Sequence, residues 1–166
     1  MDALNGWKNK MKTKFLTKEQ ALQKAKHFCA YQERCHIEVK EKLFSLGINN
    51  IDRDLIISTL IEENYVNEER FAIQYAGGKF RINHWGKNKI RNSLKGKLVS
   101  EYCISKALNS IDNDHYDRTL RNLATKKYSS LSDSREYIRK KKTIDYLLQK
   151  GYEAELVYQV VGNGEW

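Results

Sequence analysis

The chain has 166 residues, with 30 Lys and Arg against 21 Asp and Glu, a formal net charge of +9, three cysteines and no proline. The lack of proline excludes collagen-like and proline-rich sequences, and 40% hydrophobic residues with ten tyrosines exclude simple disorder. No uncharged apolar run approaches the ~18 residues that a membrane-spanning helix needs, so we expect no transmembrane helix.

The amino-terminal residues and the cysteines indicate a cytoplasmic protein. Residues 1–16 carry four lysines but lack the apolar segment of a secretory signal, so we expect a basic N-terminal arm there. Cys29, Cys35 and Cys103 are odd in number and unevenly spaced, which favours reduced thiols over a disulfide framework.

The hydrophobic pattern beyond the arm has a helical period and almost never alternates as in a strand. A capping box that begins at Thr17 predicts a helix over residues 17–33. Apolar residues spaced at i, i+4 and i+7 predict a second helix over residues 36–46, which Gly47 ends. A third helix is predicted over residues 52–64. Its inward residues are expected to be Leu55, Ile56, Thr59 and Leu60.

The same three-helix pattern returns twice along the chain. The corresponding pairs of the first helix in each copy are Ala25 and Cys29, Ala72 and Ala76, and Leu120 and Ala124. Generic helical periodicity could produce such matches by chance, but the shared register favours duplication. We therefore predict an all-α fold of three tandem three-helix repeats stacked into an elongated, curved molecule. The predicted units are residues 17–66, 67–111 and 112–166.

The positive charge is concentrated in the middle unit, since residues 67–111 carry +6 of the total +9. Seven basic residues occur there without one acidic residue between them. This basic stripe comprises Lys79, Arg81, Lys87, Lys89, Arg91, Lys95 and Lys97. A helix that starts near Gly86 would bury Ile90 and Leu94 and spread four of these basic residues over its remaining face.

Aromatic residues are interleaved with the basic stripe, notably Phe80 and Trp85. Such a surface suits a phosphate backbone, single-stranded DNA with bases stacked on Trp85 or Phe80, or an acidic protein groove. A merely solvated face is the ordinary alternative, and for Trp85 we favour packing between the fourth and fifth helices over stacking on a base. For the second basic run, residues 139–142, we expect an exposed helix with i,i+4 ion pairs.

Metal-binding and nucleophilic residues show no catalytic pattern. His27, Cys29, Cys35 and His36 lie near one another in sequence but include no C-x₂₋₄-C pair, so we expect structural thiols and no zinc. Residues 77–79, Gly-Gly-Lys, lack the full phosphate-loop pattern, and we expect the two glycines to loosen the end of the fourth helix. We therefore expect no enzymatic activity, no cofactor and no small-molecule substrate.

Six short segments carry a combination of residues that is typical of one known family. They are residues 65–72 (YVNEERFA), 78–81 (GKFR), 85–86 (WG), 89–94 (KIRNSL), 34–43 (RCHIEVKEKL) and 147–152 (LLQKGY). Together they resemble the RecX-type regulators of the RecA recombinase, and the likeness extends over residues 17–162. The positions that depart from the family pattern are Cys35, Asn67 and Leu98, where Ser, Asp and Gly are common.

The resemblance implies a bacterial protein that lies along the groove of a RecA–DNA filament and inhibits ATP hydrolysis, strand exchange and co-protease function. We accordingly expect a cytoplasmic, monomeric regulator of a RecA-type recombinase without a membrane partner. The basic stripe is the expected contact with the filament and with DNA. Two alternatives stay open, a basic helical protein that acts on DNA directly and a scaffold that recruits an acidic protein.

Overall fold

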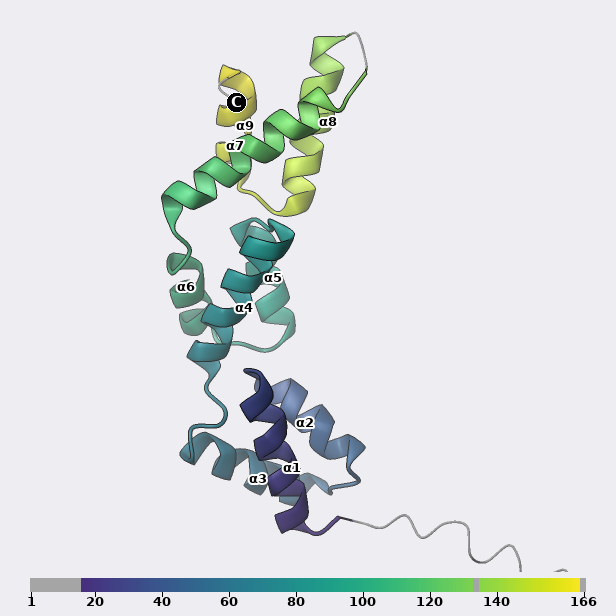
Figure 1. The fold of residues 1–166 in the computed structure, drawn as a ribbon, viewed down its shortest axis with the longest axis vertical. Coiled ribbons are helices and arrows are strands. Elements are labelled where there is room, and N and C mark those ends of the chain that lie inside the picture. Colours follow the sequence, from purple (N-terminus) through teal and green to yellow (C-terminus); the bar gives the residue numbers. More distant parts are fainter. Residues whose placement is uncertain (1–15, 133–134, 165–166) are drawn as a thin grey trace, which may run out of the picture. The chain divides into compact units, whose positions relative to one another are not determined.

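The structure is a computed structural model that describes residues 16–132 and 135–164, where all regular elements are helices. Figure 1 shows them in chain order as α1 (Lys18–Tyr31), α2 (His36–Ser45), α3 (Asn50–Glu62), α4 (Glu68–Asn83), α5 (Lys87–Gly96), α6 (Glu101–Asn109), α7 (Asn113–Ser129), α8 (Glu136–Lys150) and α9 (Ala154–Asn163). The predicted all-α fold is confirmed. The predicted N-terminal arm lies outside the described residues, apart from Leu16. None of the described helices is both long and apolar enough to span a membrane.

The helices pack in consecutive groups of three. Helices α1, α2 and α3 contact one another, α4 and α5 pack on α6, and α7 packs on α8 and α9. The chain divides between Val66 and Asn67 into two compact bodies, which we call the N-terminal body and the C-terminal body. The C-terminal body contains α4 to α9, and the three predicted domain ranges stay predictions.

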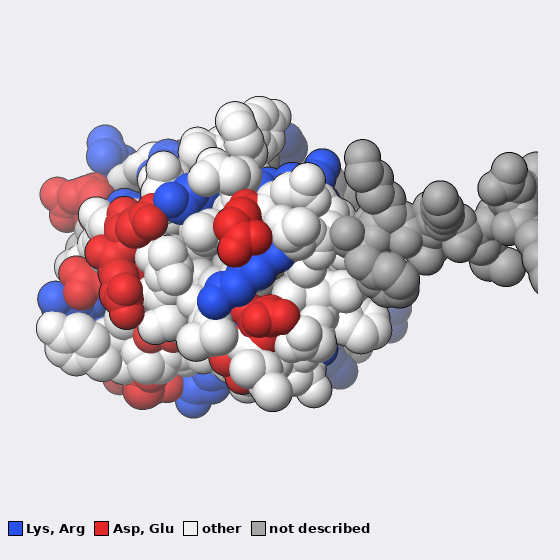
Figure 2. Space-filling model, turned by 90° about the horizontal axis from the view of Figure 1, so that it is seen from below, with Lys and Arg blue, Asp and Glu red and all other residues white. Residues whose placement is uncertain are grey.

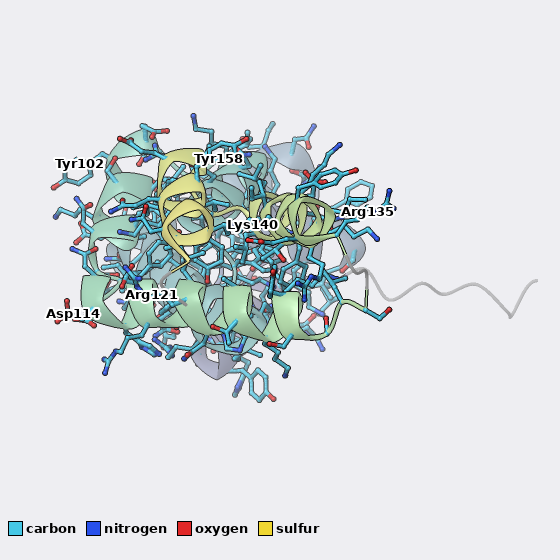
Figure 3. The ribbon with its side chains drawn as sticks, turned by 90° about the horizontal axis from the view of Figure 1, so that it is seen from above. Tyr102, Asp114, Arg121, Arg135, Lys140 and Tyr158 are labelled. Carbon is cyan, nitrogen blue, oxygen red and sulfur yellow. The ribbon has the colours of Figure 1, made fainter. Side chains whose placement is uncertain are left out.

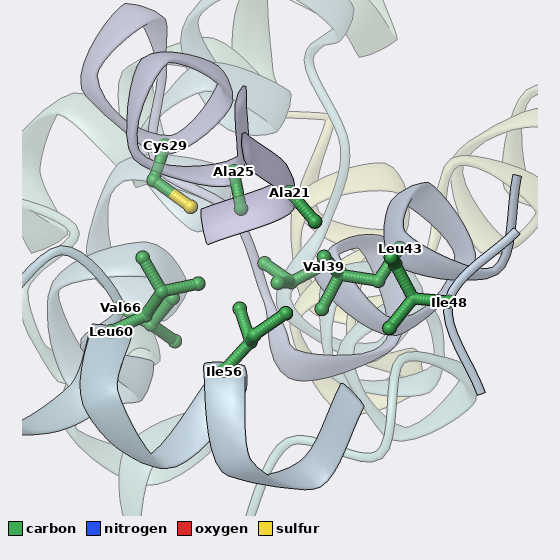
Figure 4. Packing of buried hydrophobic residues seen from close by; sticks show 9 residues of the cluster. All are labelled: Ala21, Ala25, Cys29, Val39, Leu43, Ile48, Ile56, Leu60 and Val66. Atoms are coloured by element: carbon green, nitrogen blue, oxygen red, sulfur yellow. The ribbon is translucent and has the colours of Figure 1, made fainter. Parts of the chain in front are cut away.

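The core of the N-terminal body is made of small and branched apolar side chains from all three helices (Figure 4). Its buried residues are Ala21, Ala25, Cys29, Val39, Leu43, Ile48, Ile56, Leu60 and Val66. Burial raises the pKa of the Cys29 thiol to about 11, so this sulfur stays protonated at neutral pH. Leu55 was predicted to face inward, but this was wrong because its side chain is 47% exposed.

Capping residues determine where these helices begin. The Thr17 hydroxyl accepts a hydrogen bond from the Gln20 N–H at 3.3 Å, and the Gln20 side chain accepts one from the Thr17 N–H at 3.1 Å, which confirms the capping box. Helix α3 starts two residues before its predicted first residue, because Asn49 accepts a hydrogen bond from the Asp52 N–H at 2.9 Å.

The same C-terminal turn ends the second helix of each group. In each copy the residue in left-handed conformation has a positive φ: Gly47 (78°), Leu98 (55°) and Gly151 (92°). The following N–H donates at 3.2 Å to a carbonyl five residues earlier: Ile48 to Leu43, Val99 to Leu94 and Tyr152 to Leu147. This is the hydrogen bond of a Schellman turn, and the residue that donates it is buried each time. The repeated turn supports duplication, and Leu98 adopts the conformation that glycine has in the other two copies.

Replacing Leu98 with glycine should stabilise the protein. Leu98 is 74% exposed, so the substitution removes little packing but relieves a left-handed backbone that costs a β-carbon-bearing residue about 1 kcal/mol. We expect Leu98→Gly to raise the free energy of unfolding in urea by about that amount. Leu98→Ala keeps the unfavourable φ and serves as the control; an equal gain from alanine would contradict the explanation.

Candidate functional site

The basic residues on and next to α5 lie on two flanks of its buried stripe, Ile90 and Leu94. A helix turns by about 100° per residue, so residues four apart stay on the same flank. The first flank holds Lys87, Arg91 and Lys95, and the second holds Lys89 and Lys97. The continuous stripe of the sequence therefore becomes two separate surfaces.

On the second flank, lysines gather around two aromatic rings. The Nζ atoms of Lys79 and Lys89 lie 5.0 Å and 4.9 Å from the ring centroid of Trp85. Lys79 also lies 5.2 Å from the ring centroid of Tyr75, and Lys97 lies 5.5 Å from it. These distances are those of cation–π contacts, and we call the five residues the cation–aromatic cluster.

The two rings of this cluster are partly buried, and one of them makes a hydrogen bond to α5. The Tyr75 hydroxyl is 2.6 Å from the Ser93 hydroxyl of α5, which ties α4 to α5. Trp85 follows the end of α4 and is half-buried, so part of its side chain keeps exposed surface. Phe80 differs, because its side chain is 3% exposed and packs against His115 and Tyr116. The Phe80 ring is therefore part of the core and is not accessible for stacking on a base.

On the first flank, partners from other helices occupy the basic side chains. Glu101 of α6 pairs with both Arg91 and Lys95, the latter at 3.3 Å. Lys87 donates a hydrogen bond to the Asn113 side chain at 3.1 Å. A stretch without acidic residues in sequence thus meets an acidic residue in space, and its positive charge is partly neutralised there.

Arg81 belongs to neither flank. It is exposed on α4, where its guanidinium lies against Gly77. Helix α4 continues through both glycines to Asn83, so the prediction that they loosen the end of this helix was wrong.

The first turn of α5 is capped by groups far away in sequence. Gly86 provides no side-chain cap; its N–H donates to the Lys150 carbonyl at 2.9 Å, and the Asn88 N–H donates to the Gly151 carbonyl at 3.0 Å. The intervening N–H, of Lys87, donates to the Tyr116 hydroxyl at 2.8 Å. The unsatisfied donors of one helix start are thus paired with the last turn of α8 and with α7.

Tyr116 completes this junction with a second hydrogen bond. Its hydroxyl donates to the Glu153 carboxylate at 2.6 Å, just before α9. Burial, together with this carboxylate, raises the pKa of Tyr116 well above its usual range, so the hydroxyl stays protonated and can donate. Sequence analysis missed Tyr116 and Glu153, and the only signals for the junction were the Trp85-Gly86 and Gly151-Tyr152 motifs.

The second basic run, residues 139–142, was predicted to be an exposed helix with i,i+4 ion pairs, and the structure confirms this in part. Lys140 pairs with Glu136 one turn earlier on α8 at 2.8 Å, and Figure 3 labels Lys140 on that helix. The Arg139 guanidinium lies 4.4 Å from the ring centroid of Tyr128 on α7, so it fastens α8 to α7. Figure 2 shows another face of the molecule, on which acidic and basic side chains are interspersed.

The described residues contain no group of three or more His, Cys, Asp or Glu side chains placed to hold a metal ion. Cys35 is buried at the start of α2, and burial raises the pKa of Cys103. The lysines and rings brought together in the C-terminal body are suited to binding anions or aromatic groups.

The fold and this surface define an all-α protein of three-helix domains with a basic face. Residues 67–108 match the family model of the second three-helix domain of RecX, and residues 115–161 match that of the third. Together the two matches cover more than half of the chain. The chain belongs to the RecX family, as its motifs predicted.

Similar proteins support this membership. The chain is 34% identical over 126 residues to the regulatory protein RecX of Clostridium tetani and 33% identical to that of Clostridium perfringens strain 13, each over 75% of this chain. It spans 57% and 58% of the lengths of these relatives. Its fold is similar to the crystal structure of RecX from Lactobacillus salivarius, with a TM-score of 0.79 at 23% identity over 88% of this chain and 95% of that one.

The junction predicts a strong effect of Gly86→Ala. A β-carbon on Gly86 would overlap the backbone of Gly151 and Tyr152, so the two segments would have to move apart. We expect the free energy of unfolding to fall by about 3 kcal/mol, measured by chemical denaturation. Gly96→Ala is the control, because a β-carbon there meets open space at the end of the same helix. Equal stability of the two variants would refute the close contact.

Proposed function

We propose that this protein is a regulator, mainly an inhibitor, of a RecA-type recombinase, and that it binds in the groove of the RecA–DNA filament. Membership of the RecX family supports the proposal, since its relatives are named regulatory proteins. The proposed contact surface is the cation–aromatic cluster, and the observation that supports it is that three lysines converge on two rings there. The protein would act in the bacterial cytoplasm as a monomer.

The basic stripe divides into residues suited to this contact and residues with other roles. Lys79, Lys89 and Lys97 present their charge around partly exposed aromatic surface, whereas Arg81 is exposed elsewhere on α4, against Gly77. Arg91 and Lys95 share Glu101, so they would add less to the binding of an anion. The side chains of the cluster would meet phosphates or acidic groups of the filament, and the exposed part of the Trp85 ring would stack on a base.

Inhibition would come from occupancy of the filament. If the repeats form the elongated, curved molecule predicted from the sequence, one protein would contact several recombinase protomers at once. Several weak contacts along one filament then act together, because each bound unit raises the effective concentration of the next. Such binding would limit ATP hydrolysis, strand exchange and co-protease function without any chemistry by this chain.

A recombinase ATPase assay tests the proposal. We expect the protein, below equimolar ratio, to slow ATP hydrolysis that depends on single-stranded DNA. The double variant Lys79→Gln/Lys89→Gln should need about tenfold more protein for the same inhibition, because it removes both charges over Trp85. Lys140→Gln/Lys141→Gln removes the same charge from α8 and should inhibit normally. No slowing at an equimolar ratio would refute the proposal.

Direct action on DNA is the competing outcome. Each phosphate contact on single-stranded DNA contributes about −0.7 to the slope of log affinity against log salt, so roughly four contacts give a slope near −3. Binding to naked DNA with that slope, without affinity for the recombinase, would identify a basic DNA-binding protein that needs no recombinase partner.

A further inference from the structure

A second group of lysines surrounds a single ring in the C-terminal body, outside the basic stripe. The Nζ atoms of Lys127 on α7 and Lys150 on α8 lie 5.4 Å and 5.8 Å from the ring centroid of Tyr146. The arrangement is the same as at Trp85, where two lysines of different helical segments share one ring. Tyr146 is half-buried, so part of its ring is open to solvent.

Tyr146 also lines two hollows between α7 and α8. The larger has a volume of about 580 Å³ and is lined by Lys127, Lys142, Asp145, Tyr146 and Gln149. The smaller, of about 200 Å³, is lined by Leu123, Lys126, Lys127, Ser130 and Tyr146. Three lysines and one acidic residue line the two hollows, so the net charge of their lining favours the binding of an anion.

The two lysine groups meet at the junction between α5 and α8. Lys89, which lies over Trp85, donates a hydrogen bond to the Gln149 carbonyl at 3.3 Å. Lys150, which lies over Tyr146, donates to the Asn83 carbonyl at 3.1 Å, two residues before Trp85. Each ring therefore has a lysine that reaches the backbone beside the other ring, and the basic surface continues from one three-helix group to the next.

We infer that a single strand of nucleic acid lies along this continuous track, from the cation–aromatic cluster across the junction to Lys150, Tyr146 and Lys127. The inference rests on the proposed function and deepens it: it identifies the ligand of this face as the DNA strand and extends the contact into the third three-helix group.

Ring exposure favours a single strand. The partly open rings of Trp85 and Tyr146 can stack on unpaired bases, which a duplex hides and an acidic peptide lacks.

Fluorescence anisotropy with a labelled oligothymidylate, titrated with the full chain over a salt series, tests the track. Lys127→Gln should weaken binding several-fold and reduce the salt slope by about 0.7, because one phosphate contact is lost. Tyr146→Leu should weaken binding about tenfold at an unchanged slope, because stacking releases no counterions. Thermal unfolding of each variant verifies that it is folded.

Lys141→Gln is the matched control, since it removes one exposed charge from α8 and should leave affinity and slope almost unchanged. If Lys127→Gln and Tyr146→Leu bind like this control while Lys79→Gln/Lys89→Gln loses affinity, the track ends at the junction and the inference is overturned, but the proposed function stands. If Lys127→Gln and Tyr146→Leu lose recombinase inhibition but bind DNA like the wild-type protein, the inference of a nucleic-acid track would also be overturned. Equal competition by polyglutamate, charge for charge, would identify an acidic protein as the ligand instead.

Discussion

The C-terminal body depends on one contact, in which the first turn of α5 meets the last turn of α8. Three consecutive N–H groups that begin α5 have no partner within their own helix, and they donate to the Lys150 carbonyl, the Tyr116 hydroxyl and the Gly151 carbonyl. The positive end of one helix dipole thus faces the negative end of another. Because Gly86 and Gly151 have no β-carbons, the two backbones approach closely, and this approach brings the lysines of α5 beside those of α8.

The structure sorts the basic residues by their partners. On one flank of α5 the single carboxylate of Glu101 partly neutralises Arg91 and Lys95, and Lys87 lies over the Tyr116 ring. On the other flank the lysines lie over Trp85 and Tyr75. Exposed cation–π contacts contribute ~0.5–1 kcal/mol each, and exposed ion pairs contribute about the same. Neither kind of contact holds the fold together, so the lysines of the cluster can exchange a ring for a phosphate at little cost in stability. An aromatic ring orders a lysine without reducing its charge, whereas Glu101 offsets one of the two positive charges with which it pairs.

Local patterns in the sequence predicted the helices, the capping box, the turn at Gly47 and the family, because each of these depends on residues a few positions apart. In the third group Thr143 occupies a buried position of α8, and its hydroxyl donates a hydrogen bond to the Arg139 carbonyl at 2.8 Å. A hydroxyl residue gives no apolar signal, so the hydrophobic pattern is weaker in this helix. The roles of Tyr116 and Tyr146 depend on contacts with residues of other helices, far away in sequence. The same is true of the division of the basic stripe, and no local sequence pattern contains such contacts.

The central claim is that the lysines gathered on aromatic rings face the nucleoprotein filament. Chemical acetylation of lysines, read by mass spectrometry in the free protein and in the presence of a recombinase filament on single-stranded DNA, measures this directly. The account predicts that Lys79, Lys89 and Lys97 lose reactivity on the filament, while Lys140 and Lys141 of α8 keep theirs. Unchanged reactivity of the three cluster lysines, with protection confined to the N-terminal body, would contradict it.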